Sequence, residues 1–365
     1  MHLKIAAIHT GPNTHLDHLG VLAQRLNIPL YVTDEKVFEL AQKFYPTLRC
    51  YYKGLGEMTL EFMASQFDVI LQCGKFWAAE LLPLFELFYH KKMRFAFCPH
   101  GNSDKGVSLT PDHPHTPQDI AFVYGEQMVD LLTKTGALDK VGTIIRTGNY
   151  RLPFYERRRN HFDTLAHKQV FSKFDPSKKT IFYAPTWASE ENATSFTTHC
   201  HQIIEQLKGS YNILIKLHPF LEEDHPALVH EVTAKYERHR GVIFLRDFPP
   251  IYPLLNKSDI YLGDFSSIGY DFLAFDRPLY FLNPKGQSAY LHQCGVEIPL
   301  EQQKNLATFI SSTLTQNTRD LSAVRLKAYS YAFGTKRTAK QIREELLFNC
   351  RVEAAQSHQK ACQSC

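Results

Sequence analysis

The 365-residue sequence has no large excess of charge of either sign. Lys and Arg number 41 against 37 Asp and Glu, for a formal net charge of +4, and 44% of the residues are hydrophobic. So small a surplus gives no indication of nucleic-acid binding, and the hydrophobic fraction excludes the compositions that remain disordered. We therefore expect a folded chain of about two domains, at ~150 residues each, with no nucleic-acid partner.

Long hydrophobic runs are also absent. The most apolar stretch, residues 76–88, is interrupted by Glu80, Pro83 and Glu86 and falls short of the ~20 apolar residues that a membrane span requires. The apolar run at residues 1–9 is too short for a signal peptide. These features predict a cytoplasmic chain without a transmembrane helix.

The eight cysteines do not have the spacing of a disulfide framework, and in a reducing compartment scattered cysteines are mostly small buried hydrophobic residues. The His pairs at residues 15–18 and 113–115 are isolated from any carboxylate or Cys cluster. The two His of residues 199–201 would point ~200° apart on a helix, so one metal ion could not readily use both. We predict surface or loop roles for the first two pairs and no metal site.

A regular alternation of short β-rich runs with helical patterns is typical of parallel βαβ units. The runs form two series on either side of the polar residues 155–160, so a domain boundary is expected between residues 150 and 175. The strands expected in the first series are residues 4–8, 29–32, 69–72, 94–97, 120–124 and 143–146. Those of the second series are residues 180–184, 211–216, 242–245, 260–262 and 279–281. The sequence predicts an α/β protein of two doubly wound domains, with ligands at the carboxyl ends of the strands.

The expected organisation has four parts. Residues 1–160 and 161–333 form two Rossmann-like domains, residues 334–349 a terminal helix, and residues 350–365 a frayed, flexible tail. The tail ends in a Cys-x-x-Cys pair without a second pair.

Two of the expected strands end near a histidine. One leads into His100 and Gly101, with Lys105 after them; glycine permits close backbone approach, and a His at a strand's carboxyl end is placed to face a ligand. The other ends in Lys216 and His218, which period-two alternation places on one face, so that a single anionic group could meet both. Each His could instead be an ordinary loop or rim residue.

A third strand leads into Asp264, Ser266 and Ser267, after which a helical pattern begins. Ser is a favourable N-cap, and the free N–H groups at a helix start attract phosphate. Two hydroxyls at this point could therefore bind a pyrophosphate. A plain N-cap is the alternative, but it leaves the second Ser and the later Asp271 unexplained.

Together with residues 183–187 (Tyr-Ala-Pro-Thr-Trp), these sequences resemble, in order and spacing, the CDP-glycerol glycerophosphotransferase family, which primes or polymerises poly(glycerol phosphate) in teichoic acids and related surface polymers. The resemblance covers residues 95–345. It implies a GT-B architecture, in which two Rossmann-like domains face a central cleft, with the acceptor on the first domain and the donor nucleotide on the second. It also implies that the last helix packs back on the first domain, and that no metal or other cofactor takes part.

The resemblance further implies roles for individual residues. The two important His of the family correspond to His100 and His218, which we expect to be catalytic. The expected ligands of the donor and its phosphates are Thr186, Lys216, Asp264, Ser266, Ser267 and Asp271, the last at the ribose hydroxyls. The expected acceptor-side residues are Gly101, Asn102 and Lys105. Residues 102–104 read Asn-Ser-Asp where the family more usually has Thr-Pro-Leu, a departure that bears on the donor alcohol and the acceptor.

The expected reaction is attack of an acceptor hydroxyl on the distal phosphorus of CDP-glycerol, with CMP leaving and His100 as the base. Two other functions remain open: a nucleotide-sugar glycosyltransferase or epimerase of capsule or lipopolysaccharide synthesis, and a non-catalytic descendant. The polymeric or lipid-linked acceptors of the family imply peripheral membrane association. The apolar residues Leu84, Phe85, Leu87 and Phe88 before the basic cluster of residues 90–94 suit an anionic interface, although a core helix with a basic end fits the same pattern.

Overall fold

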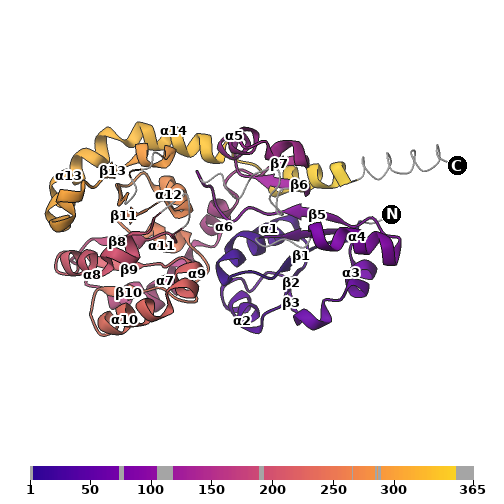
Figure 1. Ribbon diagram of the computed structural model, residues 1–365, viewed down its shortest axis with the longest axis horizontal. Coiled ribbons are helices and arrows are strands. Elements are labelled where there is room, and N and C mark those ends of the chain that lie inside the picture. The colour runs from indigo at the N-terminus through magenta and orange to yellow at the C-terminus, as the bar shows by residue number, and fades with distance from the viewer. Residues whose placement is uncertain are drawn as a thin grey trace. The chain divides into compact units, whose positions relative to one another are not determined.

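The computed structural model describes residues 3–73, 78–104, 118–188, 193–264, 266–283, 286 and 289–350. They form two α/β units, which are described separately (Figure 1). Unit 1 comprises Met1–His100, Ser108–Phe154 and Phe333–Cys365, and unit 2 comprises Gly101–Val107 and Tyr155–Ala332. The expected fold class, with two parallel-sheet domains, is confirmed.

Unit 1 is built on a seven-stranded parallel sheet with the order β3-β2-β1-β4-β5-β6-β7. Its strands are β1 (Ile5–His9), β2 (Leu30–Val32), β3 (Cys50–Tyr52), β4 (Val69–Gln72), β5 (Arg94–Phe97), β6 (Gln118–Val123) and β7 (Val141–Arg146). Its helices are α1 (Val21–Leu26), α2 (Glu35–Phe44), α3 (Leu60–Gln66), α4 (Ala78–Tyr89) and α5 (Glu126–Lys134). The order of strands reverses between β1 and β4, the switch point at which sheets of this kind bind ligands.

The central strands of unit 1 are apolar on both faces. All four residues of β4 are buried, and Ile70 shares a core with Ile8, Phe85 and Phe95. Such burial is typical of parallel sheets that helices cover on both sides. The six strands expected in this half are confirmed to within two residues at each end. Strand β3 was not expected, because this edge strand is mostly exposed.

Unit 2 is built on a six-stranded parallel sheet with the order β10-β9-β8-β11-β12-β13. Its strands are β8 (Thr180–Ala184), β9 (Asn212–Ile215), β10 (Val242–Phe244), β11 (Ile260–Gly263), β12 (Leu279–Phe281) and β13 (Val296–Glu297). Its helices are α7 (Arg159–Gln169), α8 (Ser195–Leu207), α9 (Pro219–Asp224), α10 (Pro226–Tyr236), α11 (Tyr252–Asn256), α12 (Ser267–Phe272), α13 (Leu306–Asp320) and α14 (Ser322–Phe333). This is the Rossmann strand order, with the switch point between β8 and β11. The five expected strands are confirmed, and only the two-residue β13 was missed.

The division between the units lies within the interval of residues 150–175 expected for the domain boundary, but before the expected limit of the first domain at residue 160. The division falls between Phe154 and Tyr155, inside α6 (Arg151–Arg157). It comes before residue 160 because the Tyr155 ring stacks on Tyr252 of unit 2, with centroids 6.3 Å apart. The described residues 101–104, expected in the N-terminal domain, also belong to unit 2.

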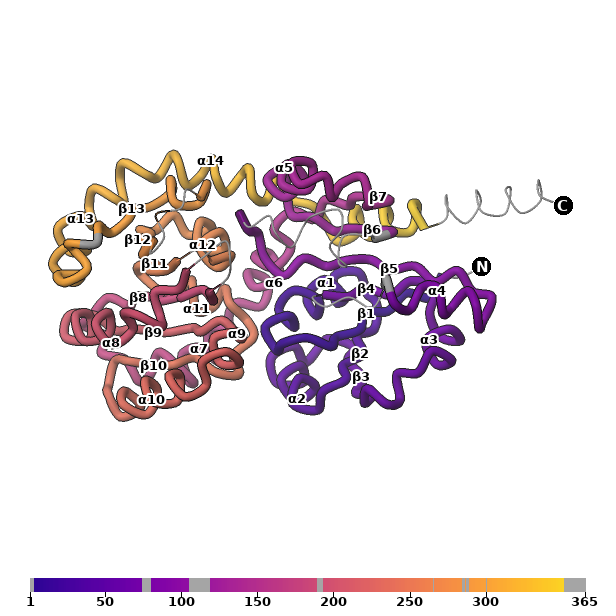
Figure 2. Tube along the Cα trace, in the orientation of Figure 1, coloured from indigo at the N-terminus to yellow at the C-terminus, as the bar shows by residue number. Residues whose placement is uncertain are grey.

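The terminal helix packs on unit 1, as expected. Residues 339–350 are helical, and Arg343 donates a hydrogen bond to the Leu26 carbonyl at the end of α1. Arg94 of β5 donates to the Cys350 carbonyl. Figure 2 shows this yellow segment beside β6 and β7. Residues 351–365, the expected tail, lie outside the described residues, and in the part that is described no helix has the length and apolar character to cross a bilayer.

Candidate functional site

Asp264 directly follows β11 and is buried, with 1% of its surface exposed. Its Oδ2 accepts hydrogen bonds from the backbone N–H groups of Thr186 (3.1 Å) and Ser195 (3.0 Å). Thr186 follows β8, and Ser195 begins α8, where the first N–H groups have no partner within the helix. The structure thus brings the predicted residues Asp264 and Thr186 together at the switch point of unit 2, with the carboxylate engaged by the protein's own backbone.

Ser266 is the N-cap of α12, as expected: its hydroxyl accepts from the N–H of Ile268 (3.4 Å). Ser267 is the first helical residue. Gly101 lies against it, because a Cβ at Gly101 would come within 2.7 Å of both Cβ and Oγ of Ser267, and the φ of Gly101 is +140°. Only glycine fits this approach without strain. Two predicted donor-site residues and one predicted acceptor-side residue therefore lie together in unit 2.

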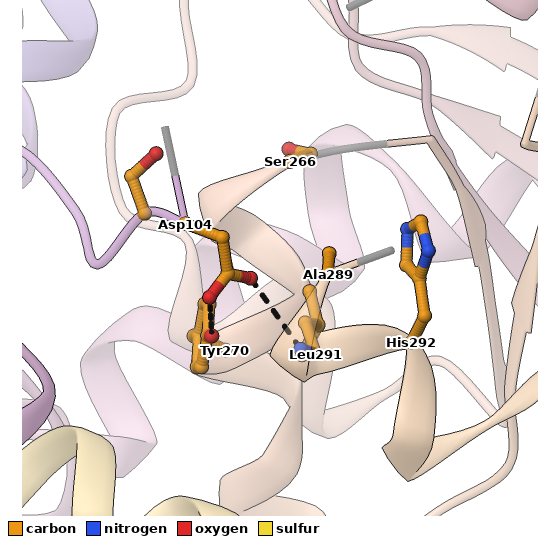
Figure 3. A pocket seen from close by; sticks show the side chains of 7 residues that line it. Asp104, Ser266, Tyr270, Ala289, Leu291 and His292 are labelled. Atoms are coloured by element: carbon orange, nitrogen blue, oxygen red, sulfur yellow. Dashed lines mark hydrogen bonds between the residues drawn. The ribbon is translucent and has the colours of Figure 1, made fainter. Parts of the chain in front are cut away.

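A small, open cavity lies beside Ser266 (Figure 3). The other residues that line it are Ser103, Asp104, Tyr270, Ala289, Leu291 and His292. Asp104 accepts hydrogen bonds from the Tyr270 hydroxyl (2.7 Å) and the Leu291 N–H (3.4 Å), drawn as dashed lines in Figure 3. Burial, followed by the charge of Asp104, raises the pKa of Tyr270 far above its usual value, so that Tyr270 remains a neutral donor.

Sequence reasoning identified only Ser266 among these lining residues. Asp104 was visible as part of the departure from the family loop, but nothing in the sequence linked it to Tyr270. No motif in the sequence marked His292 as a site residue. It is 7% exposed, with Nδ1 3.4 Å from a carboxylate oxygen of Glu297 and its ring against Phe281.

His218 is the N-cap of α9, and its Nδ1 accepts from the N–H of Phe220 (3.2 Å). Because Nδ1 accepts, the neutral ring carries its proton on Nε2. Trp187 and Phe220 pack around the ring, with centroids 5.9 Å and 5.2 Å from it. Strand β9 ends at Ile215, so Lys216 and His218 lie beyond the strand and the alternation used to place them on one face does not apply there.

Two predicted site residues have internal partners. Asp271, expected at the ribose, is 4% exposed and accepts from the Tyr252 hydroxyl of α11 (2.9 Å). Asn102, expected on the acceptor side, is 1% exposed and donates to the carbonyl of Ala332 (3.2 Å). Lys105 lies outside the described residues.

His100 follows β5 in unit 1, and its side chain is exposed. The carbonyl of Pro99, the preceding residue, accepts from the Tyr124 hydroxyl (3.1 Å). That hydroxyl lies 2.8 Å from Nδ1 of His18, and the Tyr150 hydroxyl donates to the His18 carbonyl (3.2 Å). Since the hydroxyl of Tyr124 donates to Pro99, it accepts from His18, which therefore carries a proton on Nδ1. A buried chain of side chains thus fixes the backbone just before His100.

The expectation of a loop or surface role is wrong for His18, which is buried in the chain just described. His15 lies in the connection after β1 and is half-buried, in keeping with a loop role. One ligand atom each from His15, Cys73 and His100 lie within 4.8 Å of one another, and the rings of His15 and His100 stack with centroids 4.7 Å apart. The sequence could not show this cluster, because its members come from three separate connections of the unit 1 sheet.

Two parallel sheets with Rossmann strand order, each with polar side chains at its switch point, define a two-domain, doubly wound α/β protein. The sequence profile for "CDP-Glycerol:Poly(glycerophosphate) glycerophosphotransferase" matches residues 142–330, more than half of the chain. The chain belongs to this family.

The relatives in sequence are teichoic acid enzymes of Bacillus. The teichoic acid glycerol-phosphate primase of Bacillus spizizenii is 30% identical over 131 residues, which are 35% of this chain and 30% of that protein. The primase of Bacillus subtilis strain 168 is 27% identical over 177 residues, 46% of this chain and 40% of that protein. The matched part thus spans less than half the length of these relatives.

The structural relatives agree with the fold. The wall teichoic acid polymerase TagF, in its H548A variant, superposes with a TM-score of 0.66 at 14% identity, covering 96% of this chain and 89% of that chain. The UDP-GlcNAc 2-epimerase of Neisseria meningitidis superposes with a TM-score of 0.59 at 15% identity, covering 94% of this chain and all of that chain. At such identities the likeness extends to the fold alone.

Proposed function

We propose that this protein transfers a glycerol-phosphate, or related polyol-phosphate, unit from a CDP-activated donor to a hydroxyl of a surface-polymer or lipid-linked acceptor. The family match over residues 142–330 carries the proposal, because that segment contains every strand of unit 2 and the polar residues at the ends of those strands. The acceptor oxygen bonds to the phosphorus that carries the polyol. The bond from that phosphorus to the bridging oxygen breaks, and CMP leaves with this oxygen.

His100 is the proposed base. Its exposed ring takes the proton of the acceptor hydroxyl as the new bond forms, a contribution of typically ~10²–10⁴ in rate. The fixed Pro99 carbonyl supports this role, since a base acts only where its nitrogen is held within hydrogen-bond reach of the proton.

The phosphates are proposed to bind on unit 2. His218 accepts the Phe220 N–H at Nδ1 and is proposed to donate from Nε2–H to a phosphate. Lys216 supplies charge, and the hydroxyls of Ser266 and Ser267 supply further donors beside the cavity. Asp264 and Asp271 are carboxylates that act from the interior, by holding Thr186 and Tyr252. We propose that Lys216, His218 and the two Ser hydroxyls balance the phosphate charge without a metal ion, so that transfer persists in EDTA.

The test is release of nucleotide from purified protein offered an acceptor with CDP-glycerol, CDP-ribitol or UDP-GlcNAc, each with and without EDTA. The proposal predicts CMP from a CDP-polyol in both conditions. Turnover of the UDP-sugar alone would favour the glycosyltransferase or epimerase function. Donor binding without release of any nucleotide would favour a non-catalytic descendant.

We propose that the enzyme works at the inner face of the cytoplasmic membrane. Three consecutive apolar residues that end α4 support this: Leu87 is 65% exposed, Phe88 62% and Tyr89 39%. Lys91 and Lys92 follow them, and apolar side chains next to basic ones suit an anionic lipid surface. Co-sedimentation with anionic vesicles at low salt should fall sharply on replacing Leu87 and Phe88 with Ser. Equal recovery with neutral vesicles would count against this location.

A further inference from the structure

The cluster of His15, Cys73 and His100 lies at the switch point of unit 1, where no role has been assigned to two of its members. Cys73 directly follows β4, and His100 lies three residues after β5. His15 ends the short 3-10 helix η1 (Asn13–His15), in the connection that leaves β1. Because β1, β4 and β5 are neighbours in the sheet, their carboxyl ends bring the three side chains to one place.

The geometry of the cluster is close to that of a metal site. One atom of each residue lies within 4.8 Å of the other two. Zinc bonds of about 2.0–2.3 Å at a tetrahedral angle separate ligand atoms by roughly 3.5 Å, so a shift of about 1 Å completes the site. Turning one of the stacked imidazole rings about its Cβ–Cγ bond provides such a shift, because His100 is exposed and His15 only half-buried.

The ligand types select among metals. Two imidazoles and a thiolate favour Zn²⁺ and other borderline-soft ions, whereas Mg²⁺ and Ca²⁺ require oxygen ligands. Cys73 is 2% exposed and so anchors the ion from the protein side. Three protein ligands leave a fourth position for water, as in zinc sites that exchange ligands.

We propose that His15, Cys73 and His100 bind one Zn²⁺ ion, and that this ion inhibits the enzyme by occupying the nitrogen of His100 that would accept the acceptor proton. Each imidazole gives a lone pair to the metal, the sulfur of Cys73 forms the third bond, and its thiol proton goes to solvent. The binding site stands on the cluster alone, whereas the inhibition rests on the proposed function.

The site is tested with Co²⁺, whose bond to a thiolate gives a charge-transfer band in the near ultraviolet. For this test the protein is prepared without a His tag and with Cys362 and Cys365 replaced by Ser, because a His tag or a Cys-x-x-Cys pair can itself bind the metal. The band should saturate at one ion per chain. It should vanish in Cys73→Ser and persist in Cys200→Ser, the control at a buried cysteine of α8 in unit 2. Absence of the band, or its persistence in Cys73→Ser, overturns the site.

A second variant guards against misfolding of Cys73→Ser. His15→Ala should lower the affinity for Zn²⁺ at least about tenfold, because loss of a group that merely supports a metal ligand already costs about that much. The circular dichroism spectrum should stay unchanged. Unchanged affinity in this variant overturns the assignment.

Inhibition is read from CMP release. Micromolar Zn²⁺ should stop release by the parent protein, EDTA should restore it, and Cys73→Ser should retain basal release but resist Zn²⁺. Unchanged or faster release at saturating Zn²⁺ overturns the inhibitory role. If metal-free protein releases no CMP, the proposed function fails, while the Co²⁺ band still decides the site.

Discussion

The two units hold their strand-end residues in different ways. In unit 1, side chains bond to one another in the interior, as in the chain from His18 through Tyr124 to the carbonyl before His100. In unit 2, Asp264 accepts from two backbone N–H groups and His218 from one, while Asp104 and Asp271 accept from tyrosine hydroxyls.

The difference matches the two tasks proposed. A buried network of side chains fixes a geometry only when every member is present, which suits a base that must be placed against one proton. In unit 2 a cap holds the His218 side chain by its Nδ1, and an N–H donor on the other ring nitrogen suits the proposed binding of an anion.

The largest expected effect comes from the interior of unit 1. Arg151 Nη1 lies 3.2 Å from Asp17 Oδ2, both side chains are under 10% exposed, and the Tyr45 hydroxyl also donates to Asp17. Asp17→Ala removes one partner of a buried ion pair, so it should lower the free energy of unfolding by about 3–5 kcal/mol. The control is Glu126→Ala, which breaks the exposed pair with Arg146 and should cost at most about 1 kcal/mol. If urea unfolding showed similar losses in the free energy of unfolding for the two variants, the buried ion pair would not be the stronger determinant of stability.

The next effect is a dependence on pH that belongs to unit 1. Burial lowers the pKa of His9 to about 4, an effect that nearby carbonyl oxygens offset only in part. The unfolded chain therefore takes up a proton at His9 near pH 6.5, whereas the folded chain does so only near pH 4. The free energy of unfolding should fall as the pH is lowered through this window. The difference corresponds to about 3 kcal/mol. Unfolding of the parent and of His9→Asn at pH 7 and pH 4.5 measures it, and the same slope in both would exclude His9 as the cause.

Unit 2 should depend on the carboxylate of Asp264. Asp264→Ala leaves the buried N–H groups of Thr186 and Ser195 without their acceptor, at a cost of about 2–3 kcal/mol. Amide hydrogen exchange should speed up at these two residues first. Asp264→Asn keeps an acceptor oxygen and should show a smaller loss. Equal losses in the two variants would mean that charge, rather than the hydrogen bonds, is what the site requires.

The smallest expected effect is on kcat, and it compares a tyrosine hydroxyl of unit 1 with one of unit 2. Tyr124→Phe removes the hydroxyl between His18 and the Pro99 carbonyl, and should lower kcat about tenfold, or ~1.4 kcal/mol, with little change in the donor KM. Tyr252→Phe, which removes the hydroxyl at Asp271 in unit 2, is the matched control and should leave kcat nearly unchanged. A rise in KM alone for Tyr124→Phe would place its effect on donor binding instead.

The sequence predicted the central strands of both sheets because they are continuous apolar runs. It did not reveal β3 and β13, which are short edge strands; Tyr51 and Tyr52 of β3 are about half exposed, so no buried run marks them. The domain boundary falls within the predicted interval of residues 150–175, but the polar composition of residues 155–160 gives no sign of the stacking of Tyr155 on Tyr252.

The candidate site was predicted where one short segment carries the whole signal, as in the N-cap at Ser266. It could not be predicted where the signal is a contact between distant segments. Asp104 with Tyr270, and His15 with Cys73 and His100, are of this second kind. Asp271 and Asn102 show the converse, since a polar residue at a strand end can be buried by a partner that the sequence does not announce.

The division of labour between base and donor site is tested most directly by thermal stabilisation with CDP-glycerol, measured beside CMP release. For a ligand at a hundred times its dissociation constant the stabilisation is about 2.7 kcal/mol. His100→Ala should keep this stabilisation while release slows by about 10² or more. Replacement of both Ser266 and Ser267 by Ala should instead reduce the stabilisation itself. Loss of stabilisation in His100→Ala, with full stabilisation in the double Ser variant, would contradict the assignment of the base to unit 1 and of the donor to unit 2.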